Sequence, residues 1–409
     1  MPVAGEVRAI ARRGRAYARR RRDARAVARL LPGRAPVPPG TVEVVVYFPD
    51  TAVNLYQVRQ WYEPLRLLAA HHPVVVVTRE PDATRILLAE CPVPVVPMRN
   101  IAELEQWLAT QKVTLMLYVN QNANNFSAMR FAEPAHVFVS HGESDKAYMV
   151  SNQLKAYDAV MVAGQAAVDR IAANIVGLPP ERLVRIGRPQ VDVEYEGPDL
   201  PHDGRTVVLY APTWEGDRPS MSYSSVASHG PAMVAALLAD PRFRVVYRPH
   251  PRTGVQSEEI RAAHADVARL IERANSADPS AMHLVDTKTA FGWHLRAADV
   301  CITDISAVAY DWLATGRALL VTRPASSDAA LESSPLVDAL ALVDVGDAPA
   351  IVDLVVAALV DEGATLQEVA ERYFGDTSAG ASMARFLTAA DDLVLARAAV
   401  LEGRSRTEH

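Results

Sequence analysis

The stretch Asp299–Thr322, DVCITDISAVAYDWLATGRALLVT, sets the first limits on how this chain can fold. Branched and apolar residues at its start predict a short buried strand, and Thr-Asp-Ile-Ser then supplies residues that turn the chain and begin a helix. Val308 and Trp312 lie four residues apart, which places them on one helix face, and Gly316 stands where helices commonly end. Strand character returns at Ala318–Thr322. The stretch therefore predicts a strand, a tight turn, a helix and a second strand.

The same stretch contains a candidate site for an anionic ligand. In open parallel sheets, ligands bind beyond the carboxyl ends of the strands, where a helix N-terminus offers unpaired N–H groups to a phosphate. Ser306 stands at such a helix start and would add a hydroxyl. The simpler alternative is that Ser306 only caps the helix. Evidence from other residues of the chain is needed to distinguish an anion site from a simple helix cap.

Short apolar runs alternate with helical patterns through most of the chain, which predicts an α/β fold with parallel sheets. Because 409 residues, half of them hydrophobic, are more than one core usually holds, two domains are expected. The expected strands are Val42–Phe48, Pro73–Thr78, Val93–Met98, Thr114–Val119, His136–Ser140, Ala159–Ala163, Val207–Tyr210, Phe243–Arg248, His283–Val285, Val300–Thr303, Leu319–Thr322 and Ala341–Val345. The expected helices include Tyr62–Ala70, Ile101–Thr110, Gln165–Asn174, Pro231–Ala239, Glu258–Ala274, Ala307–Thr315, Ala350–Val360 and Ser382–Glu402.

The domain limits follow from breaks in this alternation. We expect a first Rossmann-like domain at residues 41–187 and a second at residues 206–380. Residues 188–205 are polar and proline-rich, which is typical of a connection between domains. A helix within residues 381–409 is expected to pack back on the first domain. The prediction is two doubly wound domains that face a cleft, with ligand at the facing strand ends.

The first 40 residues carry a charge opposite to that of the rest. They hold 11 of the 42 basic residues and two acidic ones, a net charge of +9, which leaves −15 for the remaining residues. Residues 6–31 predict an Ala- and Arg-rich helix, and a proline-rich linker at 31–40 would separate it from the folded body. Such an arm suits an anionic membrane surface, although its apolar face is thin and a solvated or partly disordered tail is the alternative. Nucleic acid is not expected, because no aromatic platform accompanies the charge.

Several classes of protein are disfavoured by what the sequence lacks. It contains no run of 18 apolar residues, and its basic start lacks the apolar core of a signal peptide. The two cysteines, Cys91 and Cys301, indicate neither a disulfide framework nor a cysteine metal site. No carboxylate pair has metal-ligand spacing, so Mg²⁺ has no support from the sequence and no cofactor is predicted. We expect a soluble or peripheral protein of a reducing compartment.

Two candidate loops carry polar side chains directly after predicted strands. His141 and Gly142 come straight after the apolar residues Val137–Val139, and a histidine there can point into a cleft and act as a general base. A structural histidine is the alternative. Thr213 and Trp214 end a later strand with a hydroxyl and an aromatic ring, although most turns of this kind have no further role.

A third loop, Arg248-Pro-His-Pro-Arg252, is hard to explain by packing. Its two prolines stiffen the backbone around His250, and its two arginines supply cationic donors. This combination favours an anionic ligand such as a diphosphate. The fourth loop belongs to the opening stretch and contributes Asp304, Ser306 and, further along the helix, Asp311.

Four motifs stand in a fixed order: SHGESDK, LYAPTWEGD, YRPHP and ITDISAVAYDWLATGRALLVT. In this order and spacing they resemble the CDP-glycerol glycerophosphotransferase family, the teichoic acid primases and polymerases, over roughly residues 135–324. The resemblance implies a GT-B fold, with an acceptor-side domain at 41–187 and a nucleotide-donor domain at 206–380. It also implies transfer of glycerol phosphate from CDP-glycerol to a lipid-linked cell-envelope acceptor, with release of CMP, at the inner face of the cell membrane.

The family's functional residues can be placed where its motifs match. Its His-Gly pair matches His141 and Gly142, with its trailing lysine at Lys146. Its second-domain histidine matches His250, and its Asp-Tyr-Ser-Ser motif with a later Asp matches residues 304–311.

Three departures from the family pattern bear on donor and acceptor. Ala307 replaces a second serine, which removes one hydroxyl from the expected phosphate site. Ser140 stands where the family usually has tryptophan, and residues 48–61 differ from the pattern of the characterised polymerases. The chemistry itself is expected to be kept.

The expected mechanism assigns a role to each candidate. An acceptor hydroxyl, deprotonated by His141, would attack the β-phosphorus of a CDP-linked polyol. His250, Arg252 and the helix start at Ser306 would bind the diphosphate and take up charge on the leaving CMP. The other predicted donor-binding residues are Gly142, Thr213, Trp214, Arg248, Asp304 and Asp311.

Two alternatives remain from the sequence. The same fold could transfer a sugar from a nucleotide sugar, because fold alone does not fix the reaction. The chain could also be an inactive relative that binds a nucleotide or scaffolds an envelope assembly; Ala307 favours this alternative, and the retained His141 and His250 disfavour it.

Overall fold

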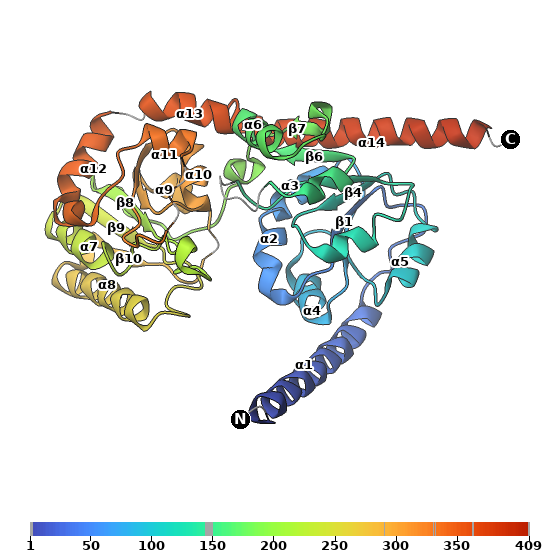
Figure 1. Ribbon diagram of the computed structural model, residues 1–409, viewed down its shortest axis with the longest axis horizontal. Coiled ribbons are helices and arrows are strands. Elements are labelled where there is room, and N and C mark those ends of the chain that lie inside the picture. Colours follow the sequence, from blue (N-terminus) through green and yellow to red (C-terminus); the bar gives the residue numbers. More distant parts are fainter. Residues whose placement is uncertain are drawn as a thin grey trace.

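The computed structural model describes residues 3–143, 150–289, 291–329, 331, 333–361 and 364–407. Its two parallel sheets lie in separate lobes, with helices around each (Figure 1). Among the described residues, no helix combines the length and the apolar character needed to span a bilayer.

The first lobe contains a seven-stranded sheet in the order β3-β2-β1-β4-β5-β6-β7. All its pairings are parallel, and β1, β2, β4, β5 and β6 are buried along their whole length, as expected of strands covered on both faces. Valine-rich runs such as VVVYF in β1 suit this environment. The strands are β1 Val44–Phe48, β2 Val74–Thr78, β3 Val95–Pro97, β4 Leu115–Tyr118, β5 Ala135–Phe138, β6 Ala159–Val162 and β7 Leu183–Arg185.

The second lobe contains a five-stranded parallel sheet in the order β10-β9-β8-β11-β12. Its strands are β8 Thr206–Ala211, β9 Phe243–Tyr247, β10 Leu284–Val285, β11 Val300–Thr303 and β12 Ala318–Val321. In both sheets the order runs outward from a central pair, β1/β4 and β8/β11, which is the doubly wound arrangement predicted from the sequence.

The helices cover the faces of these sheets and join the lobes. Those of the first lobe are α2 Leu55–Arg59, α3 Tyr62–Leu68, α4 Pro81–Glu90, α5 Ile101–Leu108 and α6 Gln165–Asn174, with α1 Val3–Leu30 before them. Those of the second lobe are α7 Gly230–Ala239, α8 Glu258–Ala277, α9 His294–Ala297, α10 Ala307–Leu313, α11 Pro335–Ala339 and α12 Ile351–Val360. The last two are α13 Ala364–Phe374 and α14 Ala381–Thr407.

The stretch Asp299–Thr322 forms the predicted unit β11-α10-β12, and β11 pairs with β12 in parallel. Trp312 is fully buried, and its indole N–H donates to the Ala318 carbonyl oxygen at 2.9 Å, which fixes the helix against the following strand. Gly316 has a φ of +67°, the left-handed conformation that ends a helix at little cost to glycine.

Among the strands, two elements differ from the sequence prediction. Ala341–Val345 is not a strand: it makes only one bridge, between Val343 and Thr322, because the chain turns into a 3₁₀ helix at Val345. A capping box between Asp344 and Asp347 begins that helix. Leu183–Arg185 was not predicted and forms the edge strand β7, whose short, partly exposed run gives little periodic signal.

The end of the chain returns to the first lobe. Helix α14 runs along this lobe (Figure 1), and Met383, Phe386, Ala390 and Val394 join the core beside β1, β4 and β5. Helix α13 packs on α6, and Tyr373 and Phe374 share a cluster of buried residues with both lobes. The lobes are therefore held together by apolar contacts as well as by the connecting segment.

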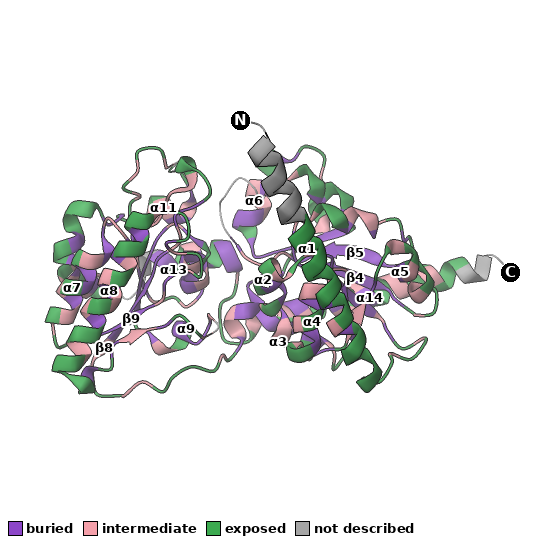
Figure 2. Ribbon diagram, turned by 90° about the horizontal axis from the view of Figure 1, so that it is seen from below, coloured by how far each residue is buried: buried purple, intermediate pink, exposed green. Residues whose placement is uncertain are grey.

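The basic helix α1 is not separated from the body by its linker. Its second half packs on α4, where Asp23 and Val27 are buried. Arg20 and Arg85 form ion pairs with Glu80 and Asp23 across this contact. The remaining described side chains of α1 are mostly exposed (Figure 2), so a row of arginines faces solvent.

Candidate active site

The loops singled out in the sequence all follow the carboxyl ends of strands. His141 comes after β5, Thr213 after β8, His250 after β9 and Ser306 after β11. Carboxyl ends of parallel strands share one edge of a sheet, which is where ligands bind in open α/β folds.

His141 is held by a backbone carbonyl. Its Nδ1 lies 3.3 Å from the Val119 oxygen at the end of β4. Because a carbonyl only accepts hydrogen bonds, Nδ1 carries the proton and Nε2 has the free lone pair. Burial lowers the pKa of His141 to about 4, and the positive charge of Arg188 acts in the same direction. The imidazole is therefore neutral at physiological pH and available as a base.

The backbone beside His141 has an unusual conformation. Ser140 has a φ of 59°, which is uncommon for a residue other than glycine. The Trp61 indole N–H donates to the Ser140 carbonyl oxygen at 2.6 Å and holds the turn in place. Gly142 follows, and Lys146, the third residue that the family motif supplies in this loop, lies outside the described residues.

His250 belongs to a cluster with Trp214 and Arg252. Its ring stacks on the Trp214 ring at a centroid distance of 6.1 Å, and the Arg252 guanidinium lies 3.6 Å from the same ring centroid. The Arg252 backbone N–H donates to His250 Nδ1 at 3.1 Å, so in the neutral imidazole Nε2 carries the hydrogen. Arg252 also reaches Asp217 at 3.3 Å. The cluster is partly exposed and combines a cation with a hydrogen-bond donor.

Arg248 does not join this cluster. Its guanidinium donates to the carbonyl oxygens of Asp286 and Thr289 at 2.9 and 2.8 Å, beside the loop after β10. Burial lowers its pKa below the ordinary value for arginine. The structure thus places Arg248 as a support for the neighbouring loop, although the sequence had grouped it with His250.

Asp304 is fully buried beneath the loops and not at their surface. Its carboxylate accepts hydrogen bonds from the backbone N–H groups of Thr213 and Ser225 and from the Thr322 hydroxyl, at 2.7, 3.2 and 2.6 Å. Burial raises its pKa to about 6, and these hydrogen bonds oppose the rise. Asp304 therefore ties the loop after β8 to the turn before α10.

Ser306 occupies the N-cap position of α10, yet its side chain makes no capping hydrogen bond. Its hydroxyl lies 3.4 Å from that of Thr303. Capping alone, the simpler alternative from the sequence, does not explain this residue. Ala307, the departure from the family motif, is the first residue of the helix.

Asp311 has a partner that the sequence did not indicate. Its carboxylate lies 2.7 Å from the Arg188 guanidinium, and both side chains are nearly buried. Arg188 also donates to Gln190 and, at 2.8 Å, to Gln60 after α2, and it lies 3.5 Å from the His141 carbonyl oxygen. This arginine joins α10 of the second lobe to the His141 loop of the first. From the sequence, Arg188 was placed only in the connecting segment; the available signal was that it is an arginine directly after a glycine, at the predicted end of the first domain.

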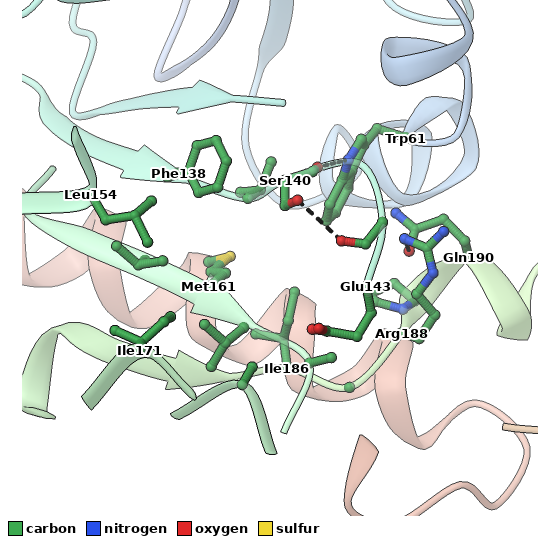
Figure 3. A pocket seen from close by; sticks show the side chains of 18 of the residues that line it. Trp61, Phe138, Ser140, Glu143, Leu154, Met161, Ile171, Ile186, Arg188 and Gln190 are labelled. Carbon is green, nitrogen blue, oxygen red and sulfur yellow. Dashed lines mark hydrogen bonds between the residues drawn. The ribbon is translucent and has the colours of Figure 1, made fainter. Parts of the chain in front are cut away.

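A cavity lies next to the His141 loop (Figure 3). It has a volume of about 40 Å³, room for roughly one water molecule, and it is lined mainly by apolar residues of β5, β6 and α6. Ser140, Glu143, Arg188 and Gln190 supply its polar wall. Glu143 forms an ion pair with Arg170 at this wall. In residues 3–143, 150–289 and the later described ranges, no three His, Cys, Asp or Glu side chains gather closely enough to hold a metal ion.

Comparison with known proteins decides the family. The model of the CDP-Glycerol:Poly(glycerophosphate) glycerophosphotransferase family matches residues 96–324, more than half of the chain. The chain belongs to this family. The resemblance predicted from the four motifs is confirmed, and the protein is a CDP-glycerol glycerophosphotransferase-like transferase. No curated protein matches the chain.

Solved structures show the fold of this family member. One of the wall teichoic acid polymerase TagF has 14% identity and a TM-score of 0.55, and the match covers 96% of this chain and 98% of that chain. Another of TagF has 14% identity and a TM-score of 0.56, with 90% of each chain covered. A UDP-N-acetylglucosamine 2-epimerase has 15% identity and a TM-score of 0.55, with 84% of this chain and 94% of that chain covered. These likenesses confirm the predicted GT-B fold.

We expect the imidazole of His141 to titrate far below the ordinary histidine range. Imidazole NMR signals of the full chain should give a midpoint near pH 4, because burial and Arg188 disfavour the charged ring. Above pH 6.5 the neutral ring contributes to stability, and this contribution is lost as the pH falls from 6.5 to about 4.

Arg188→Gln should raise this midpoint, because it removes the cation and leaves the Asp311 carboxylate without its partner. The matched control is Arg185→Gln, which changes an exposed arginine three residues away and should leave the midpoint in place. A wild-type midpoint at or above 6.5 would contradict the description of the site.

Proposed function

We propose that this transferase moves glycerol phosphate from CDP-glycerol to a hydroxyl of a lipid-linked poly(glycerophosphate) or its linkage unit. The observation that carries the proposal is the opposite tautomer of the two histidines. His141 donates through Nδ1 to Val119 and so presents a basic Nε2, whereas His250 accepts at Nδ1 and so carries its hydrogen on Nε2. His141 can therefore remove a proton, and His250 can donate a hydrogen bond. The family's name supplies the donor and the acceptor class.

In the proposed reaction, the acceptor oxygen attacks the β-phosphorus of CDP-glycerol. A bond forms between that oxygen and phosphorus as the bridging oxygen–phosphorus bond breaks, and the hydroxyl proton passes to His141 Nε2. The bridging oxygen leaves as part of CMP. Phosphoryl transfer depends mainly on positioning and on stabilisation of charge at phosphate oxygens. His250 and Arg252 are assigned to that stabilisation, because a cation and an N–H donor stand together there.

The donor is proposed to lie along the loop after β8 and the turn before α10, which Asp304 holds together. Thr213 and Trp214 would contact it from the end of β8, and Ser306 and Gly142 would contact its phosphates. Asp311 and Asp304 are proposed to act through other groups, since one carboxylate holds Arg188 and the other holds the Thr213 and Ser225 backbone. Both are therefore positioning residues and not direct ligands, which sharpens the roles assigned from the sequence.

The lipid-linked acceptor gives the basic helix α1 a proposed role at the inner face of the cell membrane. Arg15, Arg19 and Arg22 are exposed along it. Cations near an anionic bilayer each contribute on the order of 1 kcal/mol to binding. Contact with the membrane would bring the enzyme to the surface that carries its acceptor.

Substitution of either histidine tests the chemistry. His141→Ala should lower kcat/KM for CMP release about 10²- to 10⁴-fold, because it removes the base, and His250→Ala should lower kcat through loss of charge stabilisation. The assay supplies CDP-glycerol and a soluble oligo(glycerophosphate) to the full chain. His202→Ala, at an exposed histidine in the connecting segment, is the control and should keep wild-type activity. Full activity in both active-site variants would refute the assignment.

Vesicle sedimentation tests the membrane role. Exchange of Arg15, Arg19 and Arg22 for Gln should weaken binding to phosphatidylserine-containing vesicles about a hundredfold at low salt, since three interactions of ~1 kcal/mol are lost. Exchange of three exposed arginines of α8, Arg261, Arg269 and Arg273, for Gln should have little effect. Equal binding of the wild type to neutral and anionic vesicles would count against electrostatic anchoring.

A further inference from the structure

A second group of polar side chains lies at the carboxyl ends of β1 and β4. Asp50 follows β1, and Asn120 and Asn122 follow β4. These two strands are the central pair of the first sheet, from which the strand order runs outward in both directions. Ligands of doubly wound sheets bind at this point. The residues after β1 lie outside the range that the family model matches.

One carboxylate accepts hydrogen bonds from three side-chain amides at this point. Asp50 Oδ2 accepts hydrogen bonds from the Nδ2 groups of Asn54, Asn120 and Asn122 at 2.8, 3.2 and 2.9 Å. Asn120 Nδ2 also donates to Gln57 Oε1 at 2.8 Å. A carboxylate only accepts hydrogen bonds, so the amide nitrogens must face it. We call Asp50, Asn54, Asn120 and Asn122 the asparagine cluster.

This arrangement leaves one buried amide oxygen without a donor among the described residues. An amide whose nitrogen faces Asp50 directs its oxygen the other way. Asn120 is 4% exposed, and its Oδ1 is buried with no hydrogen-bond partner among the residues that the structure describes. Asp50 Oδ1 accepts only the Thr51 backbone N–H among the described groups. The unpartnered Asn120 oxygen, beside a half-buried carboxylate that can accept further hydrogen bonds, favours a ligand that donates hydrogen bonds.

The asparagine cluster is connected to His141 by direct contacts. His141 Nδ1 bonds the carbonyl oxygen of Val119, the residue before Asn120. The Tyr56 ring lies edge-on to the His141 ring at a centroid distance of 5.8 Å, and its hydroxyl accepts a hydrogen bond from Gln57 Nε2 at 3.2 Å. Tyr56 is about half exposed, with 51% of its surface accessible. The cluster and the proposed base therefore border one surface.

We propose that the asparagine cluster binds the terminal unit of the acceptor as a neutral polyhydroxyl group, a polyol or a sugar. This inference rests on the proposed function, because it gives His141 the hydroxyl that it deprotonates. Hydroxyls donate hydrogen bonds to Asp50 and Asn120, and the neighbouring hydroxyl is directed to His141 Nε2. A phosphate is disfavoured here, because it brings negative charge to Asp50, which has no ion pair with a cation among the described residues. The cluster thereby distinguishes the hydroxyl end of the acceptor from its phosphates.

The test measures binding without donor, by calorimetry on the full chain. The probe is a soluble oligo(glycerophosphate) that ends in a free glycerol. Asp50→Asn and Asn122→Ala should each weaken its binding about tenfold or more, as expected when hydrogen bonds to a charged group are lost. Asn124→Ala, on the same loop but exposed, is the matched control and should bind within about twofold of wild type. Thermal unfolding checks that each variant is folded, and Asn122→Ala provides the test if Asp50→Asn is not.

A second probe tests the preference for a neutral end. The same oligomer ending in a phosphate monoester should bind wild type at least tenfold more weakly, and Asp50→Asn should reduce this difference. Wild-type affinity in both cluster variants, or equal affinity for the two oligomers, would overturn the inference. CDP-glycerol binding should be unchanged in every variant. Oligomer binding that depends on Asp50 without any CMP release would support the subsite and refute the proposed function, so the two failures are distinguishable.

Discussion

The buried ion pair between Arg188 and Asp311 is the interaction on which the arrangement of the site depends. It joins the connecting segment to α10, and the same guanidinium donates to Gln60 of the first lobe and to Gln190 of the connecting segment. A buried arginine needs such partners, and removal of one partner of a buried pair typically costs about 3–5 kcal/mol. The pair therefore fixes the helix of the proposed phosphate site relative to the His141 loop. It also supplies part of the charge that keeps His141 neutral.

Backbone groups fix most of the other site residues. A carbonyl sets the tautomer of His141, a peptide N–H sets that of His250, and two peptide N–H groups hold Asp304. Groups held by the backbone are already placed before a substrate arrives, which is the condition for electrostatic stabilisation of a transition state. The same principle applies to the asparagine cluster, where Asp50 orients three amides before an acceptor binds.

The fold was predictable because strands that are buried on both faces of a sheet consist of nearly continuous apolar residues, which are easily recognised in a sequence. Valine-rich β1 and the unit from Asp299 to Thr322 show it, and the loops at strand ends were found from their polar residues. Side-chain direction was not predictable. Arg248 adjoins His250 in sequence but bonds the loop after β10, and Asp311 pairs with an arginine 123 positions earlier. Such contacts depend on how segments distant in the sequence pack together, and the local sequence pattern does not predict them. The domain limits and the site roles remain predictions.

The reaction proposed for this transferase breaks the bond between the β-phosphorus and the bridging oxygen of the donor. The nucleotide released from CDP-glycerol in the presence of oligo(glycerophosphate) tests it directly, because cleavage on the other side of the β-phosphate, as in glycosyl transfer, would release CDP. We expect CMP to be released in an amount equal to the glycerol phosphate units added. Release of CDP, or extension of the oligomer from a nucleotide sugar but not from CDP-glycerol, would contradict it.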